Sequence, residues 1–287
     1  MPSRRQWLLA TTVFAMRARA EPSSAVTLRY LETAPHDLFG NYVVGLLSAA
    51  VARTGLPLRL ESVPSYSISQ GRLELELVRQ ESRLDLMWSM TTRSREQMLR
   101  PLRIPLDQGL LGWRVAVIRQ AALSDWQPPP GRAELARRRA GQGLQWPDVD
   151  ILKANRFRVE TAPDSRSLYR MLELGRIDYF PRSVVEVRDE LSTFPSQPMT
   201  VAPGLLLHYP AAVYVFLSPR HERWVAPLSQ NLESLVRDGV VARLLHGLFQ
   251  ARLKELDLSR RNVIELVNPL LPPETPVQRK EFWWRPQ

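Results

Sequence analysis

Strand-like and helix-like segments alternate along residues 26–90, and this order constrains the fold more than any other feature of the chain. The ranges Val26–Leu31, Leu58–Val63 and Leu84–Met90 are rich in β-forming and apolar residues. Between them, His36–Thr54 and Ser69–Arg83 carry apolar residues at helical spacing. A β-α-β-α-β order predicts a parallel sheet that is covered by helices on both faces.

A second unit of the same kind follows the stiff connection Pro128-Pro129-Pro130. The pattern predicts strands at Arg139–Gly143, Phe157–Thr161 and Ile177–Phe180, and helices at Pro147–Asn155, Ser165–Leu174 and Val184–Leu191. Extended segments at Leu110–Arg119 and Pro198–Leu217 flank this unit, and helix returns before and after Gly239. We therefore expect an α/β fold of two lobes, each a mostly parallel sheet flanked by helices. Ligands of open α/β sheets bind at the carboxyl ends of the strands, so the cleft between the lobes is the expected site.

The first twenty residues have the features of an export signal. Arg4-Arg5 precede the apolar run Trp7–Met16, and Ala18-Arg19-Ala20 has the small-residue pattern of a cleavage site. The sequence thus predicts a signal peptide at 1–20 and a periplasmic protein. Ser3–Leu9 resembles a twin-arginine signal, and an ordinary Sec signal remains the alternative. No later apolar run is long enough to predict a transmembrane segment in the mature chain.

The basic composition does not indicate nucleic-acid binding. The formal net charge of the 287 residues is +10, but four of the 39 basic residues fall in the predicted signal peptide, which has no acid; the remainder carries about +6. Most of the other arginines alternate with acids, which is typical of a solvated helix face and excludes nucleic acid as an expected partner. The absence of cysteine excludes disulfides and thiolate metal sites.

No catalytic or metal-binding motif was found. The four histidines, His36, His208, His221 and His246, have no metal-ligand spacing among them. The chain has no Gly-x-Ser-x-Gly elbow, phosphate loop or dinucleotide loop. We therefore expect no cofactor, no metal and no enzymatic activity.

Four segments carry a resemblance to a known family. They are Leu84-Asp85-Leu86 followed by Ser89–Arg95, the junction Leu172–Asp178, the helix break Leu235–Gly239 followed by Leu244 and Phe249, and the crossing Leu110–Ile118. In these segments the chain resembles the family 3 extracellular solute-binding proteins, the polar amino-acid type, over residues 26–250. The tail segments Asn268–Pro276 and Arg279–Trp283, with Asp178–Arg182, resemble an uncharacterised subgroup.

The resemblance implies a type II periplasmic-binding-protein-like fold. Lobe 1 would comprise 21–115 and 205–287, with the tail along its surface, and lobe 2 would comprise 116–204. It also implies a protein that captures a small molecule for ABC-type uptake through a membrane permease. We expect a monomer, because the sequence pattern offers no stripe for dimer contacts. A sensory module for a membrane receptor and a periplasmic dehydratase-like enzyme on the same fold remain alternatives.

The resemblance also implies which residues bind the ligand. Arg95 takes the place of the family's arginine that pairs with a ligand carboxylate, and Arg93 is a second candidate. Thr91 and Thr92 would add hydroxyl donors. The alternative is that both arginines lie on an exposed turn and pair with Glu96.

The second lobe departs from the family pattern. Where the family has an acid that holds an α-ammonium group, this chain has Arg182 and Ser183, so we hypothesise an anionic ligand. Gln145 and Trp146 precede a predicted helix whose amide groups would attract an anion. Trp88 or Trp146 would stack on a planar ligand, and Tyr30 ends the first strand at the expected cleft; core packing is the alternative for each aromatic residue.

Overall fold

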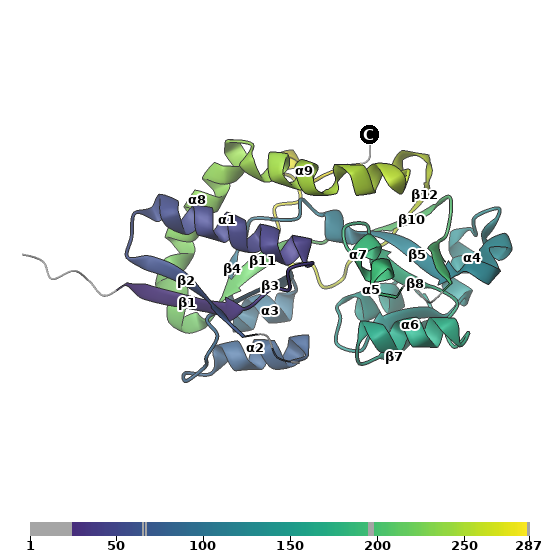
Figure 1. Cartoon of the computed structure of the whole chain (residues 1–287), viewed down its shortest axis with the longest axis horizontal. Helices are drawn as coiled ribbons and strands as arrows, with labels where there is room; N and C mark the ends of the chain where they lie inside the picture. The colour runs from purple at the N-terminus through teal and green to yellow at the C-terminus, as the bar shows by residue number, and fades with distance from the viewer. Residues whose placement is uncertain (1–24, 65, 67, 195–197, 286–287) are drawn as a thin grey trace, which may run out of the picture.

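The computed structural model describes residues 25–64, 66, 68–194 and 198–285, so the predicted signal peptide lies outside the described residues. The chain forms two lobes that lie side by side, with α9 (Val240–Glu255) running over both (Figure 1). The first lobe contains β1 (Val26–Leu31), α1 (Leu38–Thr54), β2 (Leu58–Val63), α2 (Gln70–Val78), β3 (Leu86–Met90), α3 (Arg93–Met98), β4 (Arg100–Leu102), β11 (Val213–Leu217), η3 (Pro219–Trp224) and α8 (Val225–Arg237).

The second lobe is built mainly from the middle of the chain. It contains η1 (Leu110–Gly112), β5 (Trp113–Arg119), η2 (Gln120–Trp126), α4 (Arg132–Arg137), β6 (Ala140–Gly143), α5 (Asp148–Ala154), β7 (Val159–Ala162), α6 (Ser165–Glu173), β8 (Phe180–Ser183), α7 (Val187–Ser192), β9 (Met199–Val201), β10 (Leu205–His208) and β12 (Asn262–Glu265). The short turns η4 (Leu258–Arg260) and η5 (Lys280–Phe282) follow α9.

Strand pairing in both lobes is mixed, whereas the sequence predicted mostly parallel sheets. β1 pairs with β2, β6 with β7, and β10 with β12 in parallel. β11 lies antiparallel between β3 and β4, and β5 is antiparallel to β8, β9 and β10. The antiparallel strands lie next to the segments that cross between the lobes. Their pairing partners are distant in the sequence. The predicted division assigns 205–287 to the first lobe, whereas β10 and β12 pair within the sheet of the second lobe.

One predicted strand is displaced. The sequence places it at Ile177–Phe180, but β8 covers Phe180–Ser183. Its partner in the structure is β5, with Val115 opposite Arg182 and Arg114 opposite Ser183. Because the polar end of this strand is buried by ion pairs, its hydrophobic pattern does not reveal its bounds.

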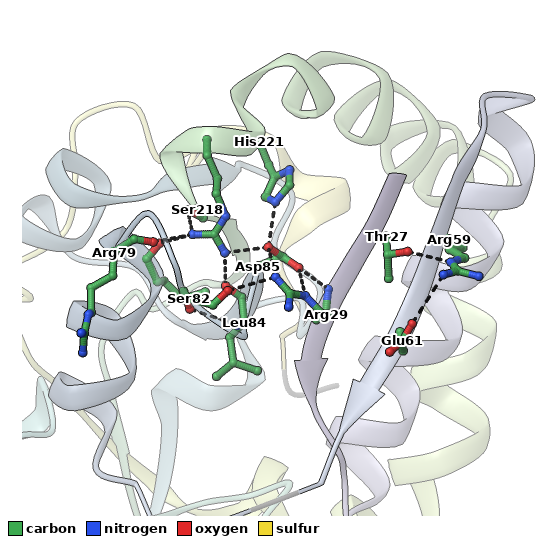
Figure 2. Close-up of polar contacts among 12 residues, drawn as sticks. Thr27, Arg29, Arg59, Glu61, Arg79, Ser82, Leu84, Asp85, Ser218 and His221 are labelled. Atoms are coloured by element: carbon green, nitrogen blue, oxygen red, sulfur yellow. Dashed lines mark hydrogen bonds and ion pairs between the residues drawn. The ribbon is translucent and has the colours of Figure 1, made fainter. Parts of the chain in front are cut away.

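A buried aspartate immediately before β3 anchors several segments of the first lobe. Asp85 is 1% exposed and accepts hydrogen bonds from Arg29 on β1 (2.8 Å), Arg220 (2.6 Å) and His221 (2.8 Å) in η3 (Figure 2). Two arginines and a histidine around one carboxylate tie three separate segments together.

The chain crosses between the lobes more than twice. β4 leads to β5, β10 leads back to β11, and α9 leads to β12. From β12 the C-terminal tail, here residues 266–285, returns to the first lobe, where Phe282 is buried and Arg279 pairs with Glu233 of α8 (2.7 Å). The largest apolar cluster includes side chains from both lobes, so the two units share part of their core.

Candidate ligand-binding cleft

A cavity of about 320 Å³ lies between the lobes; we call it the cleft cavity. The first lobe contributes the start of α1, the start of α2 and the end of β3. The second lobe contributes β5, β8 and the start of α5. Its lining residues are Asp37, Phe39, Gln70, Trp88, Ser89, Met90, Leu111, Arg114, Trp146, Pro147, Asp148, Arg182, Glu186 and Val213. The cavity therefore combines apolar surface with charged side chains from both lobes, as ligand sites do.

Two arginines of the second lobe lie at the cavity, and internal carboxylates pair with both. Arg114 is 3% exposed and contacts Asp148 at 2.9 Å and Glu186 at 3.6 Å. Arg182 contacts Glu186 at 3.0 Å and donates from Nε to Glu190 at 2.6 Å. Glu186 thus bridges two guanidinium groups, and no guanidinium of this cluster is without a carboxylate.

Tyr209 completes the cluster beneath the cavity. Its hydroxyl donates to Asp148 and accepts from Nε of Arg114 (2.9 Å). Burial raises the pKa of Tyr209 well above its ordinary value. Burial alone would lower the pKa of Arg182, but Glu190 and Glu186 outweigh it and raise that pKa. Both arginines and the tyrosine therefore keep their protons.

Glu186 is a carboxylate of the cleft whose pKa is raised above its ordinary value. Burial raises its pKa, with Glu190 and Asp148 acting in the same direction and Arg182 and Arg114 against it. Its side chain is one-third exposed, toward the cavity that it lines. A positive charge near Glu186 would therefore stabilise its ionised form.

Aromatic rings lie on both sides of the cavity. Trp88 on β3 contacts the ring of Tyr30, with centroids 6.2 Å apart. Trp146 lies over the guanidinium of Arg182 at 4.9 Å and stacks near Phe180. Two tryptophans from different lobes therefore line one cavity.

A second cavity of about 500 Å³ adjoins the first and shares Asp37, Phe39 and Glu186 with it; we call it the outer cavity. It lies between the start of α1 and the helices α6 and α7. Its other lining residues are His36, Asp164, Ser165, Arg166, Val185, Asp189, Glu190, Thr193 and Phe194. The two cavities together therefore extend from the ion pairs around Arg114 to the acidic N-terminal ends of α1, α6 and α7.

Among the residues predicted from the sequence, Trp88, Trp146 and Arg182 line the cleft cavity. Gln145 lies at its edge, with its side-chain amide against Gly71 of α2, where an added Cβ would be 3.3 Å from Oε1. Tyr30 supports Trp88 from β1 without lining either cavity.

Arg95 lies elsewhere than the resemblance suggests. It is 3% exposed, but Nε and Nη2 donate to Glu74 of α2 (3.0 and 2.5 Å) and Nη1 donates to the Met90 carbonyl. Arg95 lines neither cavity. The side chain of Arg95 is buried, as that of a ligand-binding arginine would be, but its guanidinium already pairs with Glu74 of the same lobe.

The other predicted residues have local roles. Thr91 donates to Glu96 (2.6 Å), and Thr92 caps α3 by accepting from the Arg95 amide (3.2 Å). Arg93 is exposed, and its amide donates to the Leu270 carbonyl of the tail. Ser183 is buried beside the Leu110 carbonyl.

Several lining residues were not predicted: Asp37, Phe39, Gln70, Arg114, Asp148 and Glu186. Arg114 gave a signal, because an arginine inside the apolar run Trp113–Ile118 needs a buried partner. Asp37 falls inside the predicted helix His36–Thr54. In the structure it precedes α1 and caps it by accepting from the Gly40 amide (2.8 Å), but capping alone does not indicate a site.

Two lobes with an intervening cleft, antiparallel crossings and helices on the outer faces define the type II periplasmic-binding-protein-like fold, and the fold expected from the sequence is confirmed. The sequence itself matches no known family model and no curated protein. Solved structures, by contrast, match it over most of its length.

Three of these structures illustrate the likeness. The GluR0 ligand-binding core in complex with L-glutamate has a TM-score of 0.58 and 11% identity, covering 80% of this chain and 100% of that one. The VFT2 domain of Bordetella pertussis BvgS has a TM-score of 0.57 and 20% identity, covering 79% and 93%. An ancestral arginine-binding protein bound to arginine has a TM-score of 0.56 and 13% identity, covering 80% and 100%. At these identities the likeness establishes the fold and leaves the ligand open.

Within the described ranges, no helix combines the length and the apolar character needed to cross a membrane.

Proposed function

We propose that this protein is an exported, periplasmic ligand-binding protein that captures a small polar molecule between its two lobes and delivers it to a membrane permease. The observation that carries the proposal is the cleft cavity, which is lined by charged and aromatic side chains from both lobes. A site built from two lobes binds its ligand fully only when the lobes close, which couples binding to a change of shape.

The arrangement supports binding more than catalysis. The buried acids and arginines of the cleft are paired with one another, and Tyr209 holds its proton because burial raises its pKa. A sensory role for the same cleft remains the second candidate, because a sensor's VFT2 domain shares the fold.

The sequence hypothesis of an anionic ligand rests on Arg93, Arg95 and Arg182. It requires guanidinium groups that are free to meet a ligand carboxylate. Arg95 and Arg182 are paired with glutamates, and Arg93 is exposed away from both cavities. The hypothesis therefore remains a prediction with little geometric support.

The proposal predicts that two tryptophans on opposite lobes both contribute to ligand affinity. Native mass spectrometry of the purified protein is expected to reveal a small molecule that binds with one-to-one stoichiometry. Once it is identified, Trp88→Ala and Trp146→Ala should each weaken its binding about tenfold by calorimetry, because each removes aromatic contact area.

Trp284→Ala is the matched control, because Trp284 lies outside the cleft against Trp113. Its affinity for the ligand should equal that of the unaltered protein. Normal affinity in both cleft variants would contradict the assignment of this cavity as the binding site.

A further inference from the structure

The charge of the cleft is opposite to that of the chain. The formal net charge of the protein is +10. The two adjoining cavities, however, are lined by six carboxylates against three arginines; the acids are Asp37, Asp148, Asp164, Glu186, Asp189 and Glu190, and the arginines are Arg114, Arg166 and Arg182. A concave site lined mainly by one sign of charge attracts ligands of the other sign.

The arginines that would bind a ligand carboxylate are already paired with acidic side chains of the protein. Glu74 neutralises Arg95, Asp148 neutralises Arg114, and two glutamates neutralise Arg182. A ligand carboxylate would have to displace one of these side chains and leave a buried carboxylate without its cation, which is strongly unfavourable.

The start of α3, beside the predicted arginine site, is also occupied. The Arg95 amide donates to the Thr92 hydroxyl and the Arg93 amide donates to the Leu270 carbonyl. These backbone donors are therefore not available to an anion at this helix.

Two residues that line the cavity, by contrast, have acceptor capacity that is not paired with a cation. Asp37 accepts from the Gly40 amide through Oδ1 only and has no ion pair within the described part of the chain. Gln70 donates to Ser89, while its Oε1 has no donor among the described residues. Glu186 pairs with Arg182 at 3.0 Å and with Arg114 at 3.6 Å, but its side chain is one-third exposed and lines both cavities, so a ligand cation can also approach it. The cavity thus offers acceptors and negative charge.

The aromatic lining fits the same chemistry. Trp88, Trp146 and Phe39 line the cleft cavity, and Trp146 already lies over the guanidinium of Arg182 at 4.9 Å. Faces of tryptophan attract organic cations, which also gain apolar contact there.

We propose that the cleft binds an organic cation without a carboxylate group, such as an amine or a guanidine, and that it rejects the corresponding amino acid. This inference rests on the proposed function of the same cleft and specifies the class of its ligand. Asp37 and Glu186 receive the cationic group, and the tryptophans contact its apolar part.

Matched pairs of compounds that differ by one carboxylate test the proposal: agmatine and arginine, histamine and histidine, tyramine and tyrosine. Calorimetry with the purified protein should detect at least one of the three decarboxylated compounds, with its amino acid binding at least tenfold more weakly. Equal or tighter binding of the amino acids, or a melting-temperature shift with dicarboxylates only, would overturn the inference.

Charge-neutral variants test the residues. Asp37→Asn keeps a side-chain oxygen that caps α1, and Glu186→Gln keeps the size of the side chain. Each should weaken binding of the cation at least tenfold, whereas Asp125→Asn, which makes the same charge change on exposed η2 outside both cavities, should not. Unchanged affinity in both cleft variants would refute the proposal; melting temperatures measured without ligand establish that the variants are folded.

The proposed function and this inference fail separately. If native mass spectrometry finds a co-purified molecule that carries a carboxylate, the function stands and the inference is wrong. If no small molecule co-purifies and none of the six compounds binds, both are contradicted.

Discussion

Two buried aspartates, one before β3 and one between β4 and β5, illustrate how the partners of a carboxyl group determine its pKa. Burial alone would raise the pKa of Asp85, but hydrogen bonds from His221, Arg29 and Arg220 outweigh it and hold that pKa well below its usual range. Asp107 is fully buried and accepts backbone amides of Val213 and Leu111 without a cation, and burial raises its pKa to about 6. Cationic partners therefore make the difference between the two groups.

Removal of the Asp85 charge should destabilise the protein in a pH-dependent way. Asp85→Asn leaves Arg29 and Arg220 without their carboxylate, and we expect a loss of about 3 kcal/mol in the free energy of unfolding at pH 7. Because the folded pKa is lowered, the contribution of Asp85 is present above its unfolded-state pKa of about 3.9 and is lost as the pH falls below that value. Urea unfolding at pH 7 and pH 2.5 measures the difference.

Glu61→Gln is the matched control for this change. Glu61 lies on β2 near the same region (Figure 2) and forms an exposed pair with Arg59 at 3.8 Å. Its loss should cost less than about 1 kcal/mol at either pH. A destabilisation by Asp85→Asn that is the same at both pH values would contradict the role of the ionised carboxylate.

Some site residues could be predicted from the sequence because their positions follow from local pattern. Trp88 lies two residues before the end of a buried strand and Trp146 precedes a predicted helix, so both were expected near the cleft, and both line the cavity. Arg95 was expected to be accessible to the ligand, but it pairs with Glu74, a residue of another helix. The partner of a charged side chain depends on packing between elements, which a single sequence does not specify.

At the scale of elements, the sequence predicts the bounds of a strand well when its neighbours in the sequence are also its neighbours in space. β1 and β2 have the predicted bounds, because each is followed by a turn or helix that is visible in the pattern. The strands at the crossings were less predictable. The predicted segment Leu110–Arg119 begins as η1 before β5, and β5 pairs with strands from three later parts of the chain.

The close approach of the two crossings predicts an intolerance to side chains at Gly112. A Cβ on Gly112 would lie 2.1 Å from the Tyr209 carbonyl oxygen. Since this oxygen belongs to the backbone, Gly112→Ala should lower the free energy of unfolding by about 1–3 kcal/mol.

Gly45→Ala provides the opposite case, because nothing lies within 4 Å of a Cβ added at this exposed position of α1. It should raise stability by about 0.5–1 kcal/mol. Thermal and urea unfolding of the two variants check both signs, and a neutral Gly112→Ala would refute the tight crossing.

At the scale of the whole molecule, the tail adds a connection between the lobes beyond the crossings from β4 to β5, from β10 to β11 and from α9 to β12. On the second lobe, Asn155 donates to the Val267 carbonyl (2.7 Å) and accepts from its amide (3.0 Å). On the first lobe, Leu270 accepts from the Arg93 amide and Phe282 is buried. The tail is thus bound to both lobes through separate contacts.

These contacts predict that Asn155 holds the tail against the second lobe. Asn155→Ala removes both hydrogen bonds to Val267, and since a hydrogen bond contributes about 0.5–1.5 kcal/mol, the free energy of unfolding should fall by about 1–3 kcal/mol. Hydrogen exchange should become faster at the amide of Val267 and remain unchanged in β1, whose partners lie in the first lobe. Asn231→Ala, which removes only a hydrogen bond within α8, should leave exchange in the tail unaltered. If exchange at Val267 did not change in Asn155→Ala, the contacts on the first lobe alone would hold the tail, and its bridging role would be excluded.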